Sequence, residues 1–384
     1  MSLSLPPELL SLRYRVATSN YTLEPFDRLS PTHRELLGSF QQDAGFYGIL
    51  QPLRPGLGYR TADQETAGLL HALEKPDHLP SSAQGGDPSD LLRLVLDGVL
   101  EIEWDGVFLT GPNAHGAIFP RSTDPVASGA AGLSLAALQY AESLEDPDPL
   151  SLSERLYAFN RLPTSPQWRR ALPSAEAVAK FLRLAPGGAV SSALEHGGFT
   201  PSASTGWLSW QRSSSEGNPV RKLYLSPLPR YLPRVLELLP ELVAGIDGVD
   251  SLKVGDGIEG ILRPDKCVVY LTDHQSLLRL ADRLRSELPG VPGQGVPFTA
   301  LLTSDGLMSW GSDPVETAGW RGWTGGESWR SWVVKRLAAA LVMAQAAGYH
   351  DGAPIRFAID RIALEGVDPV SWSPADSFSG YAAH

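Results

Sequence analysis

The chain has 384 residues and a formal net charge of −11 at neutral pH. This length predicts about two domains, and the acidity argues against nucleic acid as the main ligand. Hydrophobic residues make up 42% of the sequence, but no apolar run approaches the ~18 residues that a membrane-spanning helix needs. We therefore expect a protein with a sizeable core and with neither nucleic acid nor a membrane as partner.

The single cysteine, Cys267, lies in the apolar run CVVYL. One cysteine excludes a disulfide framework and a thiolate metal cluster, and the apolar run predicts a buried strand thiol. No histidine pair has the HExxH spacing, so we expect no metal site. The N-terminal sequence MSLSLPPELL lacks the basic flank and cleavage site of a secretory signal, which predicts a cytoplasmic protein.

Residues 1–160 are expected to form an N-terminal, mostly helical domain. Two amphipathic segments, QETAGLLHALEK and DPSDLLRLVLDG, precede VLEIEWDGVFLTG, which alternates around Asp105-Gly106. Asp-Gly between alternating apolar runs predicts a hairpin. Two helices and a hairpin are typical of a winged-helix-like module, which could bind a peptide by edge-strand addition. An ordinary helix-hairpin subdomain fits the same pattern.

Residues 161–384 alternate helices and strands. Strands are expected at 220–226, 251–254, 266–272 and in FTALLT and IRFAIDRI. Ser174, Asp273 and Ser328 are positioned to cap the helices that follow them. No Gly-rich strand-to-helix turn appears, so the pattern favours an α+β fold, with a mostly antiparallel sheet packed with helices, over a doubly wound sheet.

Candidate site residues occupy these predicted strands. In VRKLYLS, Lys222, Tyr224 and Ser226 share one face because side chains alternate along a strand. Lys253 points away from the apolar layer in SLKV, and Arg263 precedes the strand that contains Tyr270. Neighbouring strands would therefore gather three cations and two phenols on one sheet face.

Such a cluster suits a phosphate dianion, which takes arginine as a bidentate partner and lysine as a point charge. A lysine crowded by other cations and partly desolvated also has a lowered pKa, which makes it a usable general base. The alternative is an ordinary solvated face, because lysine and arginine are common there.

The order Lys222, Tyr224, Lys253 and Arg263 resembles the bacterial phosphothreonine lyases, in which a Lys-x-His strand precedes a catalytic lysine and a phosphate-binding arginine. The strings VRKLYLSPLP, VVYL, GLMSWGSDP and ESWRSWVVKRLAAAL are similar to the HopA-type effector family. Actinobacterial relatives of that family serve lanthipeptide and thioamitide assembly. The resemblance covers about residues 165–365.

The resemblance implies a carbon–oxygen lyase that β-eliminates phosphate from phosphoserine or phosphothreonine in a precursor peptide of lanthipeptide-like (RiPP) biosynthesis. It implies a separate Ser/Thr kinase as partner and no metal or organic cofactor. By position, Lys253 matches the base that removes the α-proton. Lys222 and Arg263 match the cations that grip phosphate.

This sequence departs from the family pattern at two points. Tyr224 stands where the lyases carry the histidine that protonates the leaving phosphate, and a phenol is a weaker acid than imidazolium. His196 or His274 could supply that proton instead. The second phosphate-binding arginine has no clear match, and Arg330 and Arg336 are candidates by motif order.

A second class of function uses the same basic face without chemistry. In that reading the chain is a HopA-type adaptor or effector that binds a peptide or partner protein. A hydrolase triad around Ser226 lacks the G-x-S-x-G elbow, and GVDSLKVGDGIEG lacks the order of a phosphate-binding loop. Neither of these is expected.

Overall fold

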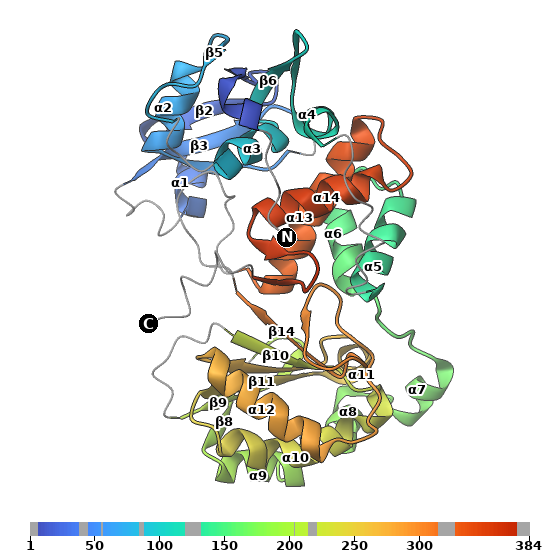
Figure 1. The fold of residues 1–384 in the computed structure, drawn as a ribbon. Helices are drawn as coiled ribbons and strands as arrows, with labels where there is room; N and C mark the ends of the chain where they lie inside the picture. Colours follow the sequence, from blue (N-terminus) through green and yellow to red (C-terminus); the bar gives the residue numbers. More distant parts are fainter. Residues whose placement is uncertain are drawn as a thin grey trace.

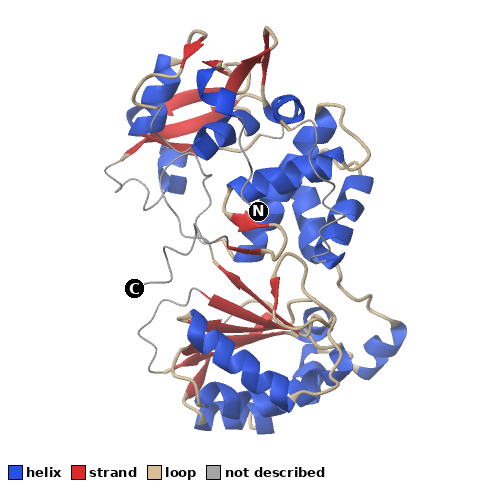
Figure 2. Cartoon of the chain, viewed as in Figure 1, coloured by secondary structure: helices blue, strands red, loops and turns tan. Residues whose placement is uncertain are grey.

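The computed structural model describes residues 7–37, 45–54, 57–83, 88–119, 132–202, 204–213, 221–313 and 327–374. Helices and antiparallel sheets are mixed, as expected for an α+β fold (Figures 1 and 2). Across the described ranges, no helix is both long and apolar enough to cross a membrane.

The N-terminal part contains two small antiparallel sheets, ordered β5-β1-β6-β7 and β2-β3-β4. The predicted order of two helices and a hairpin is confirmed by α2, α3 and the β6–β7 pair. The turn residues of this hairpin, Asp105 and Gly106, have φ of 49° and 79°, which is the left-handed conformation that a two-residue hairpin turn needs. The strands are β1 (Arg13–Val16), β2 (Tyr21–Pro25), β3 (Phe46–Pro52), β4 (Arg60–Asp63), β5 (Asp77–His78), β6 (Leu100–Trp104) and β7 (Val107–Leu109), and the helices are α1 (Pro31–Leu37), α2 (Gln64–Ala72), α3 (Pro88–Leu96), α4 (Gly111–Ile118), α5 (Gly132–Ser143) and α6 (Pro149–Ala158).

A seven-stranded sheet follows, in which every pairing is antiparallel and the order is β13-β14-β10-β12-β11-β9-β8. The three strands predicted at 220–226, 251–254 and 266–272 lie side by side at the centre of this sheet. Its strands are β8 (Phe199–Ser202), β9 (Trp207–Arg212), β10 (Arg221–Leu225), β11 (Val249–Gly255), β12 (Cys267–Leu271), β13 (Ala300–Leu301) and β14 (Met308–Ser312), and β15 (Val367–Asp368) and β16 (Ser373–Pro374) form a separate pair.

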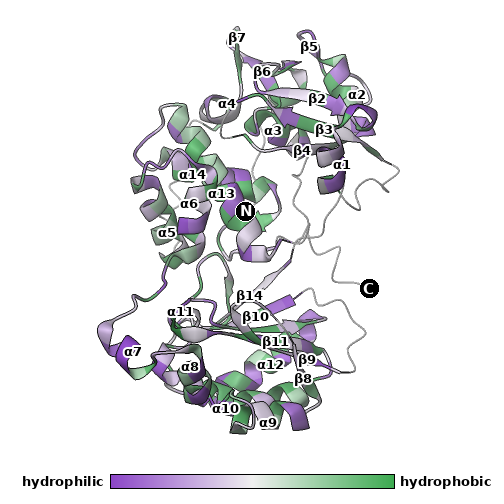
Figure 3. Cartoon of the chain, turned by 180° about the vertical axis from the view of Figure 1, so that it is seen from behind, coloured by the Kyte–Doolittle hydropathy of each residue, from purple (hydrophilic) through white to green (hydrophobic). Residues whose placement is uncertain are grey.

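One face of this sheet is covered by amphipathic helices (Figure 1), whose mixed colouring is visible from behind in Figure 3. Leu223 and Leu225 of β10 point into this core, as predicted. Ser174 and Asp273 accept hydrogen bonds from the first turns of α8 and α12, which confirms both predicted caps. These helices are α7 (Pro166–Ala171), α8 (Ala175–Phe181), α9 (Ala189–His196), α10 (Leu232–Ala244), α11 (Gly257–Ile261) and α12 (His274–Glu287).

The opposite face meets a helical layer built around α13 (Trp329–Ala346), which packs against α6 and α14 (Ala353–Leu364). Ser328 caps α13, as predicted. The helices α13 and α14 share one apolar core with residues of the N-terminal part. The division of the chain at residue 160 stays a prediction.

The segment IRFAIDRI is helical, in α14, and not a strand as predicted. Its apolar residues also fit a helix, because Ile355, Ala358 and Ile362 are spaced by three and four and are all buried. Packing against α13 decides between the two patterns.

Candidate active site

The candidate site lies on the sheet face that meets the helical layer. In the register of the sheet, Lys222 stands opposite Tyr270, and Val268 stands opposite both Tyr224 and Lys253. Since residues paired across antiparallel strands project to the same side, these side chains share one face. The two lysines therefore flank the central strand β12 on the same side of the sheet.

Arg263 reaches this face through a close approach of two backbone segments. Gly255 ends β11, and a Cβ placed on it would lie 2.4 Å from the carbonyl oxygen of Gly260 in α11. No real side chain tolerates that distance, so glycine at this position allows α11 to sit against the strand. The chain leaves α11 directly into Arg263.

Cations and aromatic rings alternate along the site. Lys222 Nζ lies 5.1 Å and Lys253 Nζ 5.2 Å from the ring centroid of Tyr270. The indole of Trp207 is 4.3 Å from Lys253 Nζ and 4.5 Å from the guanidinium carbon of Arg263. A cation over an aromatic face gains about 0.5–2 kcal/mol, depending on its desolvation. The rings thus offset part of the repulsion between neighbouring positive charges.

Tyr157 of α6 extends this series into the helical layer. Its ring centroid lies 5.9 Å from the guanidinium carbon of Arg263 and 4.3 Å from that of Arg330. We call the seven side chains of this series the basic array; its members are Lys222, Tyr270, Lys253, Trp207, Arg263, Tyr157 and Arg330.

The two lysines of the array differ in their acidic partners. Lys222 Nζ forms an ion pair with Asp313 Oδ2 at 2.5 Å. Asp313 Oδ1 accepts the backbone N–H of Trp329 at the start of α13, at 2.8 Å, so this carboxylate is held in place. Among the described residues, no carboxylate pairs with Lys253.

Lys253 loses its proton more readily than an ordinary lysine does. Burial and the neighbouring Lys222 charge lower the pKa of Lys253 to about 8. Arg263 acts in the same direction, whereas Asp265 and Asp313 oppose the change. Lys253 can therefore present a neutral amine next to the cationic guanidinium of Arg263.

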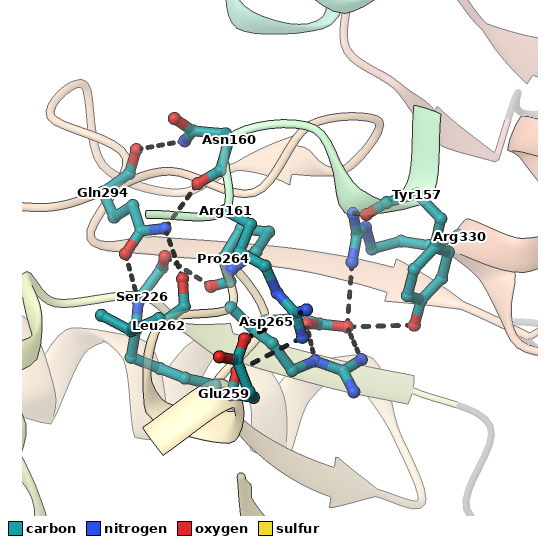
Figure 4. A network of polar contacts seen from close by, with 12 residues as sticks. Tyr157, Asn160, Arg161, Ser226, Glu259, Leu262, Pro264, Asp265, Gln294 and Arg330 are labelled. Atoms are coloured by element: carbon teal, nitrogen blue, oxygen red, sulfur yellow. Dashed lines mark hydrogen bonds and ion pairs between the residues drawn. The ribbon is translucent and has the colours of Figure 1, made fainter. Parts of the chain in front are cut away.

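Asp265 is a hub that joins the sheet to the helical layer (Figure 4). Its carboxylate accepts hydrogen bonds from Arg263 Nε at 2.9 Å, Arg263 Nη2 at 3.0 Å and the Tyr157 hydroxyl at 3.0 Å. Arg330 Nη1 forms an ion pair with the same carboxylate at 2.9 Å. Burial raises the pKa of Asp265, but Arg330 and Arg263 more than offset that effect and hold it well below its usual range.

The network fixes Arg263 and engages Arg330 differently. Asp265 accepts hydrogen bonds from Nε and Nη2 of Arg263, and the Nη1 group of Arg263 lies outside this bidentate contact. Arg330 is only 1% exposed and also donates to the carbonyl oxygens of Pro297 and Tyr157. Arg330 therefore supports the site from behind Asp265.

Tyr224 lies on the same face and is 3% exposed. It packs with Val268 and Val296, and with Trp207 and Tyr270 of the array. Burial raises the pKa of Tyr224 well above its ordinary value. Burial likewise raises the pKa of Tyr270. Each phenol therefore keeps its proton at any moderate pH.

The structure places both candidate histidines on the other side of the sheet. His196 ends α9 on the exposed surface, and its Nδ1 lies 2.6 Å from the carbonyl oxygen of Ser192. His274 begins α12, and its ring centroid is 4.9 Å from that of Trp310, which packs into the apolar core. Neither imidazole is next to the lysines.

Arg336 lies about one and two-thirds turns beyond Arg330 on α13, in a different buried cluster. It forms ion pairs with Glu327 and Glu365 at 3.8 and 3.7 Å and lies over the ring of Trp332. Of the two arginines proposed by motif order, only Arg330 belongs to the basic array.

Lys266 sits beneath the array and is fully buried. Its Nζ donates to Gln294 Oε1 at 2.7 Å, and the Gln294 side chain donates in turn to the carbonyl oxygens of Asn160 and Leu262. Burial lowers the pKa of Lys266 to about 7. The ammonium form is thus disfavoured in the folded protein.

We expect Lys266→Met to raise the free energy of unfolding by roughly 1–3 kcal/mol at pH 7 and below, because it removes a desolvated amine that has one amide partner. Between pH 7 and 10.5 the unfolded chain binds more protons than the native one, so wild-type stability rises with pH and the gain shrinks. Denaturant titrations at several pH values measure this. Lys180→Met, in an exposed pair with Glu176, is the control and should change little; a destabilised Lys266→Met protein would contradict the argument.

Several groups of the site were missed at the level of sequence. No strand was predicted at Trp207, although alternation in GWLSWQR places Trp207 opposite in direction to Leu208 and Trp210, which pack against the core. Asp265 lies in the segment ILRPDK, where nothing in the local sequence shows that two arginines meet its carboxylate. Tyr157 and Asp313 come from distant elements and had no signal.

Metal ligands are not gathered in the described ranges, where no group of three or more histidine, cysteine, aspartate or glutamate residues could hold an ion. Cys267 is buried in β12 on the core face, as predicted, and burial raises the pKa of its thiol to about 12. The nitrogen atoms of the basic array are suited to an anionic ligand.

No protein-family model and no curated protein matches the sequence. Among solved structures, an effector protein from Pseudomonas syringae pv. tomato strain DC3000 has 9% identity and a TM-score of 0.43, over 63% of this chain and 97% of that one. An effector protein from Pseudomonas syringae pv. syringae strain 61 has 11% identity and a TM-score of 0.38, over 66% and 99%. The type III effector and phosphothreonine lyase OspF from Shigella flexneri has 16% identity and a TM-score of 0.26, over 32% and 74%. With values this low, functional conclusions have to come from the geometry of the site.

Proposed function

We propose that this protein is a lyase that β-eliminates phosphate from phosphoserine or phosphothreonine in a peptide. The observation that carries the proposal is the contrast between the two lysines on one sheet face. Lys253 has a lowered pKa and no acidic partner among the described residues, whereas Lys222 forms an ion pair with Asp313. A base beside fixed cations is what removal of a proton next to a phosphate leaving group requires.

In the proposed reaction, the neutral amine of Lys253 takes the proton from the Cα atom of the phosphorylated residue. The electron pair of that C–H bond forms the Cα=Cβ double bond, and the Cβ–O bond to phosphate breaks. Lys222 and Arg263 hold the phosphate oxygens and offset the charge that collects on them. The products are a dehydroamino acid and inorganic phosphate, with no change in the overall redox state and no cofactor.

Tyr224 is the proposed donor of a proton to the departing phosphate. A phosphate dianion leaves as the trianion when it takes no proton, and the trianion is a far stronger base than a phenolate. An ordinary phenol can therefore protonate the trianion, and burial, which raises the pKa of Tyr224, opposes this transfer. The position of Tyr224 on the sheet face that carries Lys222 and Lys253 supports this role over the two histidines, which lie beyond the sheet.

The family resemblance extends the proposal to a substrate and a setting. The substrate would be a precursor peptide of lanthipeptide-like (RiPP) biosynthesis, phosphorylated by a separate Ser/Thr kinase in the cytoplasm. The N-terminal part, with its winged-helix-like order of elements, would hold a segment of that peptide. The edge strand β7 of its sheet is the proposed contact.

The experiment is incubation of the protein with a phosphoserine or phosphothreonine peptide, followed by mass spectrometry. We expect a mass loss equal to phosphoric acid, without any added metal or nucleotide. Because the base must be neutral, kcat/KM should rise with pH and level off above the Lys253 pKa of about 8. The rise of kcat with pH should lie at higher pH than the rise of kcat/KM, since the bound dianion favours the ammonium form of Lys253.

A non-catalytic adaptor is the second candidate, and one observation favours it. The residue at the proton-donor position is a buried phenol with a raised pKa, which suits binding better than acid catalysis. In that case the phosphopeptide would bind, its affinity would fall in Arg263→Ala, and its mass would remain unchanged at every pH.

A further inference from the structure

Trp207 is the one member of the basic array that touches both the proposed base and the proposed phosphate-binding arginine. Its ring centroid lies 4.3 Å from Lys253 Nζ and 4.5 Å from the guanidinium carbon of Arg263. It begins β9, where it pairs with Gly255, so no side chain of the neighbouring strand residue separates the indole from the array. The indole is half-buried, which strengthens its interaction with a cation.

The face of an indole carries negative electrostatic potential and favours a nearby ammonium over a neutral amine. This effect opposes burial and the Lys222 charge, both of which favour the neutral form of Lys253. The two influences act on the same nitrogen. Their balance determines at which pH the amine becomes available.

We infer that Trp207 is a positioning residue that stabilises the ammonium form of Lys253 and keeps it apart from the Arg263 guanidinium. It limits the fraction of neutral Lys253 amine in the absence of substrate and sets the direction of the amine. The role of Trp207 in turnover, as a regulator of the proposed base, rests on the proposed function. The effect on protonation itself does not, because it depends only on the contacts of the free protein.

Other charged and titratable groups also face Lys253 and are held constant in the comparison. They are Lys222 of β10, Tyr270 of β12, Arg263 and Asp265 before β12, and Asp313 after β14. None of these groups is exchanged by a change at position 207, although Arg263 loses its own contact with the indole. A change in the proton affinity of Lys253 in such a variant can therefore be assigned to the ring.

The test measures the pKa of Lys253 directly, from the pH dependence of the 13Cε chemical shift in protein labelled at lysine. The chain has only six lysines, so the signals can be assigned with single Lys→Arg variants. In Trp207→Leu, which keeps an apolar side chain but removes the ring, we expect the pKa of Lys253 to fall by about half a unit to one unit. In Trp207→Phe, which keeps a smaller ring, we expect a shift of less than half of that.

A second measurement keeps the shape of the side chain unchanged. Site-specific replacement of Trp207 by fluorinated tryptophans weakens the negative potential of the ring face without changing its burial. We expect the pKa of Lys253 to fall progressively with the number of fluorine atoms. A pKa that is unchanged or raised across this series, with the fold intact by circular dichroism, would overturn the inference.

Elimination assays on the same variants separate the two proposals. If the pKa of Lys253 falls but no variant and no wild-type protein eliminates phosphate, the lyase proposal fails and the role of Trp207 in protonation stands. If wild-type protein eliminates phosphate but the pKa is insensitive to the ring, the lyase proposal stands and the Trp207 inference fails. With both correct, the acidic limb of kcat/KM in Trp207→Leu moves to lower pH by the same amount as the pKa.

Discussion

Lys253→Gln should lower the rate of phosphate elimination by about 10²–10⁴-fold, because it removes the general base while keeping a polar side chain of similar length. The effect should fall mainly on kcat, since Lys222 and Arg263 still hold the phosphate. The residual rate should also lose the pH-dependent limb expected near pH 8 in the wild-type protein. Steady-state kinetics with a phosphopeptide across pH 6–10 measure kcat, KM and the pH dependence of the rate.

Lys222→Gln is the matched control for this variant. It removes a cation from the same sheet face, but one that is paired with Asp313, so it should weaken phosphate binding and keep a pH-dependent limb. Small primary amines should partly restore activity to Lys253→Ala. An unchanged limb in Lys253→Gln would show that Lys253 is not the base, even if the rate fell.

Asp265→Asn should destabilise the protein by about 3–5 kcal/mol, because it removes the charge that two buried arginine contacts share. The carboxylate is only 3% exposed and binds Arg263, Arg330 and Tyr157 at once. Since its pKa is lowered by folding, its contribution is complete above about pH 4 and is lost as pH falls further. Denaturant unfolding at pH 7 should therefore show the full difference.

The same substitution should raise KM for the phosphopeptide, because Arg263 loses the partner that orients its guanidinium. Asp282→Asn removes an exposed carboxylate that pairs with Arg285 and should change stability by less than about 0.5 kcal/mol. Tyr157→Phe removes a single donor to Asp265 and should cost about 1 kcal/mol. Equal effects of Asp265→Asn and Asp282→Asn would show that the hub is energetically unimportant.

The faces of the central strands could be predicted from the sequence because they depend on local alternation. Lys222 and Tyr224 alternate with Leu223 and Leu225, and only one of these sets can face an apolar core. The α+β class and the helix caps follow from equally local patterns. The spacing within each segment was sufficient to identify which side chains point away from the core.

The partners of those side chains could not be predicted, because they come from elements far apart in the chain. Asp265 meets Arg330 from α13 and Tyr157 from α6, and no periodic pattern links three such positions. Arg330 was expected to contact phosphate, whereas its burial and hydrogen bonds place it behind Asp265. The helical form of IRFAIDRI likewise depends on tertiary packing, because its apolar spacing fits both structures.

The position of Cys267 bears on how the protein would withstand the product of the proposed reaction. A dehydroamino acid has a double bond conjugated to a carbonyl group, and such alkenes alkylate thiolates. The one sulfhydryl of this chain is on the far side of the sheet, without solvent access, and retains its proton at moderate pH. Repeated turnover should therefore leave the protein free of covalent adducts at sulfur.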